Sequence, residues 1–120
     1  MDQRVSGFDT AVLRRAIEGN DAEALAGLYA RDAVLRIIDR SHTPSAPLEL
    51  RGREAIAALY RDICGRAMTH RIEDLVADGD RVSFTEACAY PDGLKVFCAA
   101  MIALKDGRIV RQTNVQAWDE

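Results

Sequence analysis

The stretch "RVSFTEACAY", residues 81–90, decides the fold, because it is typical of a strand that buries one face. Side chains alternate between the two faces of a strand. One face of this stretch is apolar except at its centre, where Glu86 is flanked by Val82, Phe84, Cys88 and Tyr90. The sequence therefore predicts a carboxylate in the middle of a row that faces a core.

Turn sequences divide the second half of the chain into strands. The triplets "DGD" (78–80), "PDG" (91–93) and "KDG" (105–107) are each typical of a tight turn between antiparallel strands. The strands expected around them are residues 69–78, 81–90, 95–104 and 108–118. Strands joined by consecutive hairpins predict an antiparallel meander.

The two last strands differ in their alternation. The strand at 95–104 offers a clear inward row: Val96, Cys98, Ala100, Ile102 and Leu104. In the strand at 108–118 one alternating set is largely polar: Val110, Gln112, Asn114, Gln116 and Trp118. The other set is mixed: Ile109, Arg111, Thr113, Val115 and Ala117. Periodicity alone does not decide which set of this strand points inward.

The beginning of the chain has helical periodicity. Apolar residues recur at helical spacing over residues 10–29, and Gly19 interrupts them. Gly19 is expected to end one helix, and Asn20 or Asp21 to cap the next. We therefore expect two short helices here, the second with an apolar stripe that extends to Tyr29.

The middle of the chain combines a strand, a loop and a helix. "AVLRII" (33–38) has the β-branched bias of a strand, and "DRSHTPSAPLEL" (39–50) predicts an irregular loop of the length that is often functional or mobile. "GREAIAALYRDI" (52–63) has the apolar face of a helix. Amphipathic helices that cover one face of a meander predict an α+β fold, in a single domain of residues 1–120.

The composition excludes several classes of function. The net charge is −3 with mixed signs along the chain, so no basic surface for nucleic acid is expected. No apolar run approaches the roughly 18 residues of a membrane span. The N-terminus also lacks a secretory signal, which predicts a cytoplasmic protein with no membrane partner.

The cysteines and the absence of ligand-binding motifs argue against a metal or a cofactor. Three cysteines without a CxxC spacing predict no metal site, and neither a nucleotide-binding loop nor a nucleophile elbow occurs. Cys88 and Cys98 are expected to be buried thiols, with a redox pair across the hairpin as the alternative. No cofactor is expected.

Three segments together carry a family resemblance: "GNDAEALAGLYARDAVL" (19–35), "LRGREAIAALYRDI" (50–63) and "DGRIVRQTNVQAWDE" (106–120). In this order they resemble the nuclear transport factor 2-like superfamily, in its SnoaL-like and ketosteroid isomerase-like branch. The resemblance implies a cone, in which a strongly curved antiparallel sheet wraps around the N-terminal helices and a pocket opens at the wide end. It also implies a homodimer through the outer sheet face. On the last strand it implies that Val110, Gln112, Asn114 and Gln116 line the pocket.

The resemblance does not carry isomerase chemistry onto this chain. Ketosteroid isomerases use a base and an oxyanion hole built from a tyrosine and a protonated aspartate. The matching positions here fall near Leu13 and Ala100, whose side chains cannot donate a hydrogen bond. The base position falls on Ile37, or on Asp39 with a two-residue insertion. A related epoxide hydrolase mechanism needs an Asp-Arg-Asp set, and no strand clearly offers its inward arginine.

Three residues are the candidate catalytic groups: Glu86, Asp39 and His70. A buried Glu86 is suited to proton transfer, and the alternatives are an ion pair with an arginine such as Arg36 or a solvated rim position. Asp39 is either a base or the cap of a turn. His70 beside a carboxylate suits dehydration or cyclisation, and a surface histidine is the alternative.

The candidate ligand-binding residues are aromatic, thiol and amide side chains: Tyr29, Tyr60, Phe84, Cys88, Gln112, Asn114 and Gln116. Amides orient a carbonyl or hydroxyl group, unless they face water on the outer sheet. The predicted ligand is a small, partly apolar carbonyl or hydroxyl compound, such as a polyketide-, steroid- or terpenoid-like molecule. The predicted function is a cofactor-free cyclase, isomerase or dehydratase, with a non-catalytic ligand-binding or dimerisation module as the alternative.

Overall fold

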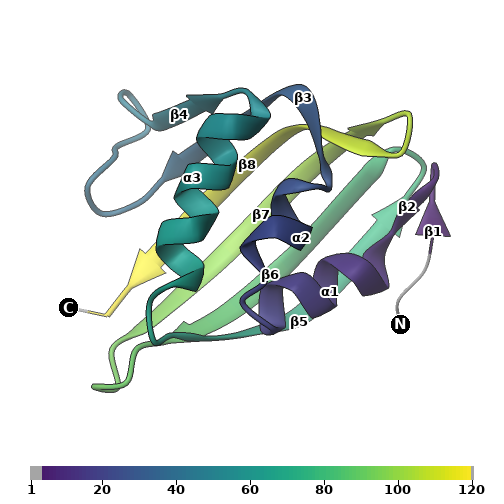
Figure 1. Ribbon diagram of the computed structural model, residues 1–120. Coiled ribbons are helices and arrows are strands. Elements are labelled where there is room, and N and C mark those ends of the chain that lie inside the picture. Colours follow the sequence, from purple (N-terminus) through teal and green to yellow (C-terminus); the bar gives the residue numbers. More distant parts are fainter. Residues whose placement is uncertain (1–3, 120) are drawn as a thin grey trace.

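The computed structural model describes residues 4–119, in which a curved six-stranded sheet carries the helices on one face (Figure 1). In chain order the elements are β1 (Arg4–Val5), β2 (Phe8–Asp9), α1 (Thr10–Glu18), α2 (Ala22–Ala26), β3 (Tyr29–Ile38), β4 (Leu48–Arg51), α3 (Arg53–Cys64), β5 (Thr69–Asp78), β6 (Arg81–Ala89), β7 (Lys95–Lys105) and β8 (Arg108–Trp118). This arrangement confirms the predicted α+β fold.

The sheet has the strand order β4-β3-β8-β7-β6-β5. Strands β5 to β8 form three consecutive antiparallel hairpins, which confirms the predicted meander. At the other side of the sheet β3 pairs antiparallel with β4 and parallel with β8. The first long strand of the chain therefore lies beside the last one.

The helical break occurs where the sequence indicated it. Gly19 ends α1, and the Asp21 side chain accepts a hydrogen bond from the Ala24 amide, 3.1 Å away, at the start of α2. The prediction that the helix extends to Tyr29 is wrong. The Leu28 carbonyl accepts from the Ile109 amide at 2.9 Å, so the pairing with β8 draws Tyr29 into β3.

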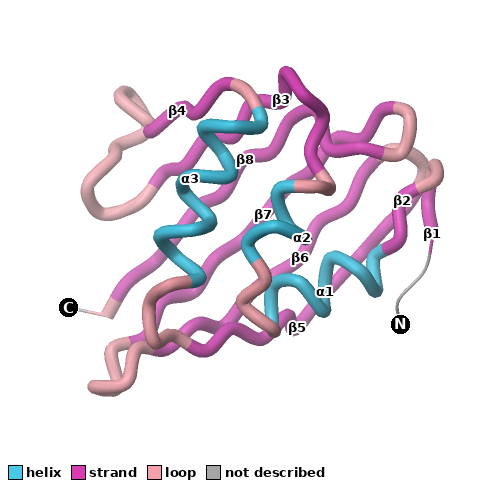
Figure 2. Tube along the Cα trace, viewed as in Figure 1, coloured by secondary structure: helices cyan, strands magenta, loops and turns pink. Residues whose placement is uncertain are grey.

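The long loop is shorter than the sequence suggested. Residues 48–51 form β4, whose Leu50 pairs with Leu35 of β3, so the irregular part covers residues 39–47. Figure 2 shows this loop at one edge of the sheet. The β1–β2 hairpin is also unpredicted, and its turn has positive φ at Ser6 and Gly7. None of the described helices is long and apolar enough to span a membrane.

A β-bulge explains why the last strand has no clear alternation. Leu104 pairs with Ile109, and the neighbouring Ala103 pairs with Arg111, so Val110 is an extra residue in β8. Both Ile109 and Gln112 are therefore buried, at 0% and 3% exposure, although their positions differ by an odd number. One bulge moves the inward row of β8 from odd to even positions.

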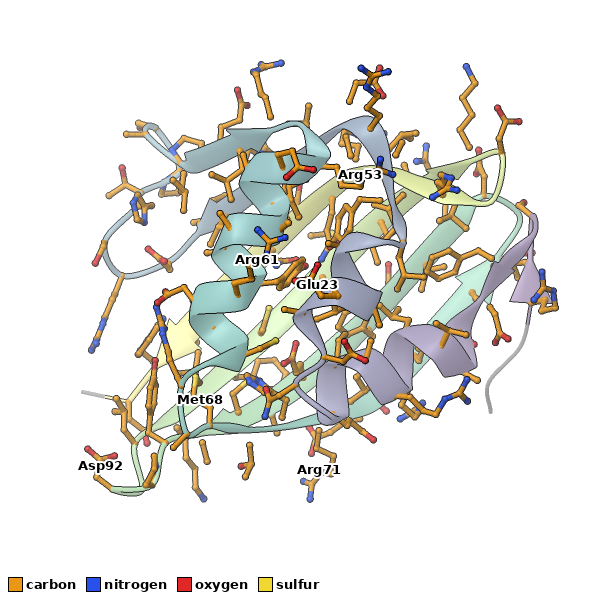
Figure 3. All side chains as sticks on the ribbon, in the orientation of Figure 1. Glu23, Arg53, Arg61, Met68, Arg71 and Asp92 are labelled. Carbon is orange, nitrogen blue, oxygen red and sulfur yellow. The ribbon has the colours of Figure 1, made fainter. Side chains whose placement is uncertain are left out.

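Two groups of buried residues share the concave side of the sheet. The larger group packs α1, α2 and α3 onto the sheet, around residues such as Leu13, Leu35 and Ile56. The smaller group consists of Met68, Cys88 and Val96, with Tyr90 and Trp118 packed against it. Figure 3 places Met68 at the same end of the sheet as the β6–β7 turn that holds Asp92.

Candidate functional site

A pocket lies on the concave face of the sheet and is lined from both groups of buried residues. Its walls come from α1, α2, α3 and from strands β3, β5, β6, β7 and β8. The predicted ligand-binding residues all line it: Tyr29, Tyr60, Phe84, Cys88, Gln112, Asn114 and Gln116. Val110 is not among the described lining residues, because the bulge takes it out of the inward row.

Glu86 and His70 meet in this pocket. Glu86 Oε2 lies 2.9 Å from His70 Nδ1, and the two side chains are 14% and 6% exposed. The pairing of β5 with β6 places His70 opposite Cys88, two residues beyond Glu86 on the same face. The partner of Glu86 is therefore a histidine of the neighbouring strand, and not the arginine Arg36 considered from the sequence.

The Glu86 carboxylate fixes the tautomer of His70. An ionised carboxylate only accepts hydrogen bonds, so Nδ1 carries the ring proton and donates it to Oε2. The other ring nitrogen, Nε2, is buried and has no hydrogen-bond partner among the described residues. Buried polar atoms are rarely left unpaired, and His70 lines the pocket, so its Nε2 is an acceptor whose hydrogen bond is unmade among the described residues.

The amides of β8 form a directional hydrogen-bond chain. The Tyr29 hydroxyl donates to Gln112 Oε1 at 2.6 Å, and Gln112 Nε2 donates to Asn114 Oδ1 at 2.9 Å. Because Tyr29 gives its proton to Gln112, the Tyr60 hydroxyl, 2.5 Å away, donates to Tyr29. The chain ends at Asn114 Nδ2, whose two hydrogens are accepted by none of the described side chains.

The side-chain amide of Gln116 also has a free N–H group, like that of Asn114. Its Oε1 accepts from the Trp118 indole nitrogen at 3.1 Å, so its Nε2 is the free end of the amide. Gln116 and Asn114 both line the pocket on β8. This wall therefore presents N–H donors to the pocket, which suit a carbonyl or an oxyanion.

The two tyrosines are hydrogen-bonding groups and not bases. Burial raises the pKa of Tyr29 well above its usual range, and the neighbouring Tyr60 raises it further. Burial also raises the pKa of Tyr60, against the opposing effect of its hydrogen bond with Tyr29. Both phenols stay protonated at neutral pH.

The cysteines that line the pocket are protonated as well. Burial first, and then the nearby Glu86 charge, raise the pKa of Cys98 to about 12. The same two causes, in the same order, raise the pKa of Cys88, whose thiol donates to Glu86 Oε2 at 3.2 Å. Burial raises the pKa of Cys64. None of these thiols is therefore an activated nucleophile at neutral pH.

Aromatic and basic residues gather at one end of the pocket. The rings of Tyr90 and Trp118 lie 6.1 Å apart, and the Arg40 guanidinium lies 4.1 Å from the centre of the Trp118 ring. Arg66 donates to the Tyr90 hydroxyl at 3.0 Å and pairs with Asp62. Arg40 belongs to the loop at 39–47, so this loop lies against the pocket end.

The structure does not bring Asp39 into the pocket. Its carboxylate accepts from the Ser41 and His42 amides, at 2.9 and 2.8 Å, and from His42 Nδ1 at 2.9 Å. Burial raises the pKa of Asp39, but the hydrogen bonds from His42 and Ser41 outweigh it and lower the pKa overall. Asp39 has the geometry of a turn cap, the alternative reading of the sequence. Ile37, the other candidate position, is 4% exposed in the core.

Leu13 and Ala100, near which the resemblance implied the oxyanion donors of the isomerases, both line the pocket. Both side chains are apolar and cannot donate a hydrogen bond. Asn20, which the sequence offered only as a helix cap, also lines the pocket. Its Nδ2 donates to the Met68 carbonyl at 3.1 Å, while its Oδ1 is buried without a partner. Asn20 has a positive φ, and no sequence pattern predicted its position in the pocket wall.

Comparison with known protein families assigns this chain to a family. A sequence profile described as "SnoaL-like domain" matches residues 10–112. No curated protein matches the chain by sequence.

Solved structures support the same assignment at the level of the fold. An NTF2-like protein of unknown function from Mesorhizobium loti superposes with a TM-score of 0.77 at 22% identity, over 90% of this chain and 89% of the other. A proposed ketosteroid isomerase from Kribbella flavida has a TM-score of 0.71 at 20% identity, over 92% and 76%. A proposed polyketide cyclase from Sinorhizobium meliloti has a TM-score of 0.65 at 22% identity, over 88% and 91%.

Proposed function

Because the chain belongs to the SnoaL-like domain family of the nuclear transport factor 2-like superfamily, we propose that it transfers protons on a small carbonyl compound without a cofactor. The observation that carries the proposal is His70 in the pocket, with Nδ1 bound to Glu86 and Nε2 buried and unpartnered. A neutral imidazole held in this tautomer by a carboxylate is a general base.

The proposed step removes a proton from the carbon next to a carbonyl group. His70 Nε2 takes this proton, and the Glu86 carboxylate stabilises the imidazolium that forms. The electron pair of the broken C–H bond moves into the carbonyl, which becomes an enolate. The N–H groups of Asn114 or Gln116 are the donors that suit the enolate oxygen.

The fate of the enolate defines the reaction class. Return of the proton from His70 to another carbon is an isomerisation, attack of the enolate carbon on a second carbonyl is a cyclisation, and loss of a β-hydroxyl as water is a dehydration. The aromatic and aliphatic walls of the pocket favour a polyketide-, steroid- or terpenoid-like skeleton. The proposed activities of the structurally similar cyclase and isomerase belong to the same chemistry.

An epoxide hydrolase mechanism is not favoured. The described lining residues contain one arginine, Arg66, and one carboxylate, Glu86, but no aspartate. Arg66 is paired with Asp62 outside this lining and with the Tyr90 hydroxyl. An Asp-Arg-Asp set is therefore not assembled among these residues.

Hydrogen exchange at carbon tests the proposal directly. The protein is incubated in deuterated buffer with a panel of polyketide-like β-dicarbonyl and cyclic enone compounds, and deuterium next to the carbonyl is measured by mass spectrometry. We expect protein-dependent exchange of at least one compound. His70→Asn and Glu86→Gln should slow it by roughly 100- to 10,000-fold, the usual contribution of a general base.

Two controls give this experiment its meaning. Cys64→Ser changes a pocket side chain outside the His70–Glu86 pair and should keep the exchange rate within a few-fold of the wild type. Ligand binding by the His70→Asn variant, followed by tryptophan fluorescence, should also persist. Exchange that survives in His70→Asn contradicts the assigned base.

A second role, dimerisation, is favoured by the outer face of the sheet. Phe97 and Met101 of β7 and Val115 of β8 are 47%, 49% and 42% exposed. Cross-strand pairing puts Phe97 beside Ala117 and Met101 beside Thr113, so small side chains surround these three. A homodimer through this face is therefore part of the proposed function, and a non-catalytic dimerisation module is the alternative if no compound exchanges.

A further inference from the structure

We infer that His70, Glu86 and Cys88 also form a binding site for a divalent transition-metal ion, with zinc as the best fit. The site goes beyond the proposed proton transfer. The inference that an ion there blocks that transfer does rest on the proposed function, whereas the binding itself does not.

The donor atoms are of the kinds that zinc prefers. His70 Nδ1, Glu86 Oε2 and Cys88 Sγ all lie within 4.8 Å of one another. Imidazole nitrogen, carboxylate oxygen and thiolate sulfur are the three common protein ligands of zinc, and calcium or magnesium would avoid the sulfur. The combination therefore selects a borderline-soft transition metal.

The separations are close to those of a zinc tetrahedron. The N–O distance is 2.9 Å, and both distances to the sulfur are 3.2 Å. Bond lengths of about 2.0 Å to N or O and 2.3 Å to S give edges of roughly 3.3–3.6 Å. The side chains need to move apart by only a few tenths of an ångström.

The backbone holds the three side chains in place before any ion arrives. Glu86 and Cys88 are two residues apart on β6, and His70 pairs with Cys88 from β5. All three side chains therefore leave the same face of two hydrogen-bonded strands. Ligands on rigid strands lose little freedom on binding, which favours a built site over a chance one.

Charge balance also favours an ion here. A divalent ion with one carboxylate, one thiolate and one neutral imidazole has no net charge, which suits a buried pocket. Binding requires the Cys88 thiol to lose its proton to the solvent, while the His70 ring proton moves from Nδ1 to Nε2. One proton is released for each ion bound. Three protein ligands leave the fourth zinc position open to the pocket.

Occupation of the site and proton transfer exclude each other. A metal on Nδ1 replaces the hydrogen bond to Glu86 and places a proton on Nε2, the nitrogen assigned as the base. The Glu86 carboxylate then binds the ion and no longer stabilises an imidazolium on His70. A bound zinc ion should therefore stop deuterium exchange, and removal of the ion by a chelator should restore it.

Cobalt(II) is the probe for the site, because cobalt bound to a thiolate has a charge-transfer absorption that nitrogen and oxygen ligands do not give. Titration of the purified, metal-free protein should give one such site per chain, with one proton released per ion in weak buffer. Zinc should displace the cobalt. Cys88→Ser removes one ligand and should weaken zinc binding by at least roughly 100-fold. Even residues that only hydrogen-bond to a ligand contribute roughly 10- to 100-fold to metal affinity.

The chain offers a matched control and a check that needs no variant. Cys98 is buried in the same pocket but lies outside the three-atom set, so Cys98→Ser should keep the cobalt band. If Cys88→Ser does not fold, X-ray absorption of the zinc-loaded wild type should show one sulfur neighbour. An ion on the other histidine, His42 beside Asp39, would show none.

The outcomes separate the two proposals. A thiolate band that survives Cys98→Ser and disappears in Cys88→Ser supports the site. A zinc neighbourhood without sulfur, or no stoichiometric binding, overturns it. A metal-free protein that exchanges deuterium but binds no cobalt keeps the proposed function and loses the metal site, and the reverse result keeps only the site.

Discussion

At the scale of the residue, Glu86 governs the chemistry of its neighbours. Cys98 lies opposite it across the β6–β7 pair, and Cys88 donates its thiol proton to it. Burial, followed by the negative charge of Glu86, disfavours both thiolates. The carboxylate therefore protects two cysteines while its own hydrogen bond orients His70.

These thiols predict a loss of stability in alkali. In the unfolded chain a cysteine ionises near its ordinary pKa of about 8.5, whereas folded Cys98 ionises only near pH 12. A raised folded pKa gives stability that is complete below about pH 8.5 and is lost as the pH rises toward 12. The free energy of unfolding, measured in urea at steps between pH 7 and 11, should fall across this window.

A variant isolates the contribution of one thiol. Cys98→Ala should reduce the slope of unfolding free energy against pH above 8.5, because it removes one of the groups that ionise on unfolding. An unchanged slope in Cys98→Ala contradicts the assignment. In the native protein the half-buried Cys64 should react with an alkylating reagent at pH 8 before Cys88 and Cys98 do.

The sequence predicted that Glu86 points inward, but it did not predict which residues Glu86 contacts. Alternation along β6 was sufficient to place Glu86 inward, because that strand has no bulge. The pairing of Glu86 with His70 depends on the register of β5 against β6, which shifts between Ile72 and Leu75. No local pattern encodes such a shift, so the cluster with Cys88 was not predictable from spacing.

At the scale of the element, the bulge in β8 sets the amide wall of the pocket. The extra residue Val110 allows Ile109 to fill the core and Gln112 to accept from Tyr29 in the same strand. Without it the strand would turn Asn114 and Gln116 to the outer face, since a one-residue shift exchanges the two faces.

Deletion of Val110 should therefore be strongly destabilising. The shortened strand keeps either Ile109 or Gln112 inward but not both, so it loses a buried apolar side chain or a buried hydrogen bond. We expect a loss of at least about 2–4 kcal/mol in the free energy of unfolding, within the range for core truncation or a lost buried partner. Urea denaturation followed by fluorescence measures it.

The control keeps the bulge and trims its side chain. Val110 is only half-buried, so Val110→Ala should cost less than about 1 kcal/mol. Equal losses in the two variants would show that the side chain and not the extra residue matters.

Element boundaries were predictable where a local signal sets them. Gly19 and Asp21 end and begin helices through their own conformation and hydrogen bonds, and the turn triplets fixed the hairpins. Tyr29 and β4 were not predicted, because their state depends on distant strands. Pairing with Ile109 extends β3 back to Tyr29, and pairing with β3 turns the end of the loop into β4.

At the scale of the whole molecule, one face of the sheet is covered by helices and the other is not (Figure 1). The uncovered face carries the exposed Phe97, Met101 and Val115. Contiguous apolar side chains on an open face mark an interaction site. The ion pair of Glu23 with Arg61, 2.9 Å long, instead joins α2 and α3 on the helical side (Figure 3).

Phe97→Glu should convert the proposed homodimer into a monomer. The charged side chain lies within the apolar face, where a second copy would bury it unpaired. Size-exclusion chromatography with light scattering should give twice the chain mass for the wild type and the single mass for the variant. Ala58→Glu, at an exposed position of α3 on the helical side of the sheet, should remain dimeric. A monomeric wild type contradicts the proposal.

The parallel pairing of β3 with β8 has a consequence for how the chain is made. Tyr29 of β3 pairs with Ile109 of β8, and Ile38 pairs with Val115. Strand β3 is synthesised early, so one of its sides stays unpaired until the 11-residue strand β8 leaves the ribosome. Contacts between such distant segments slow folding, and an unpaired strand edge invites association with other chains. A ribosome that stalls before β8 therefore leaves a nascent chain with two additional open strand edges, on β3 and β7, and such a chain is a natural client for a chaperone.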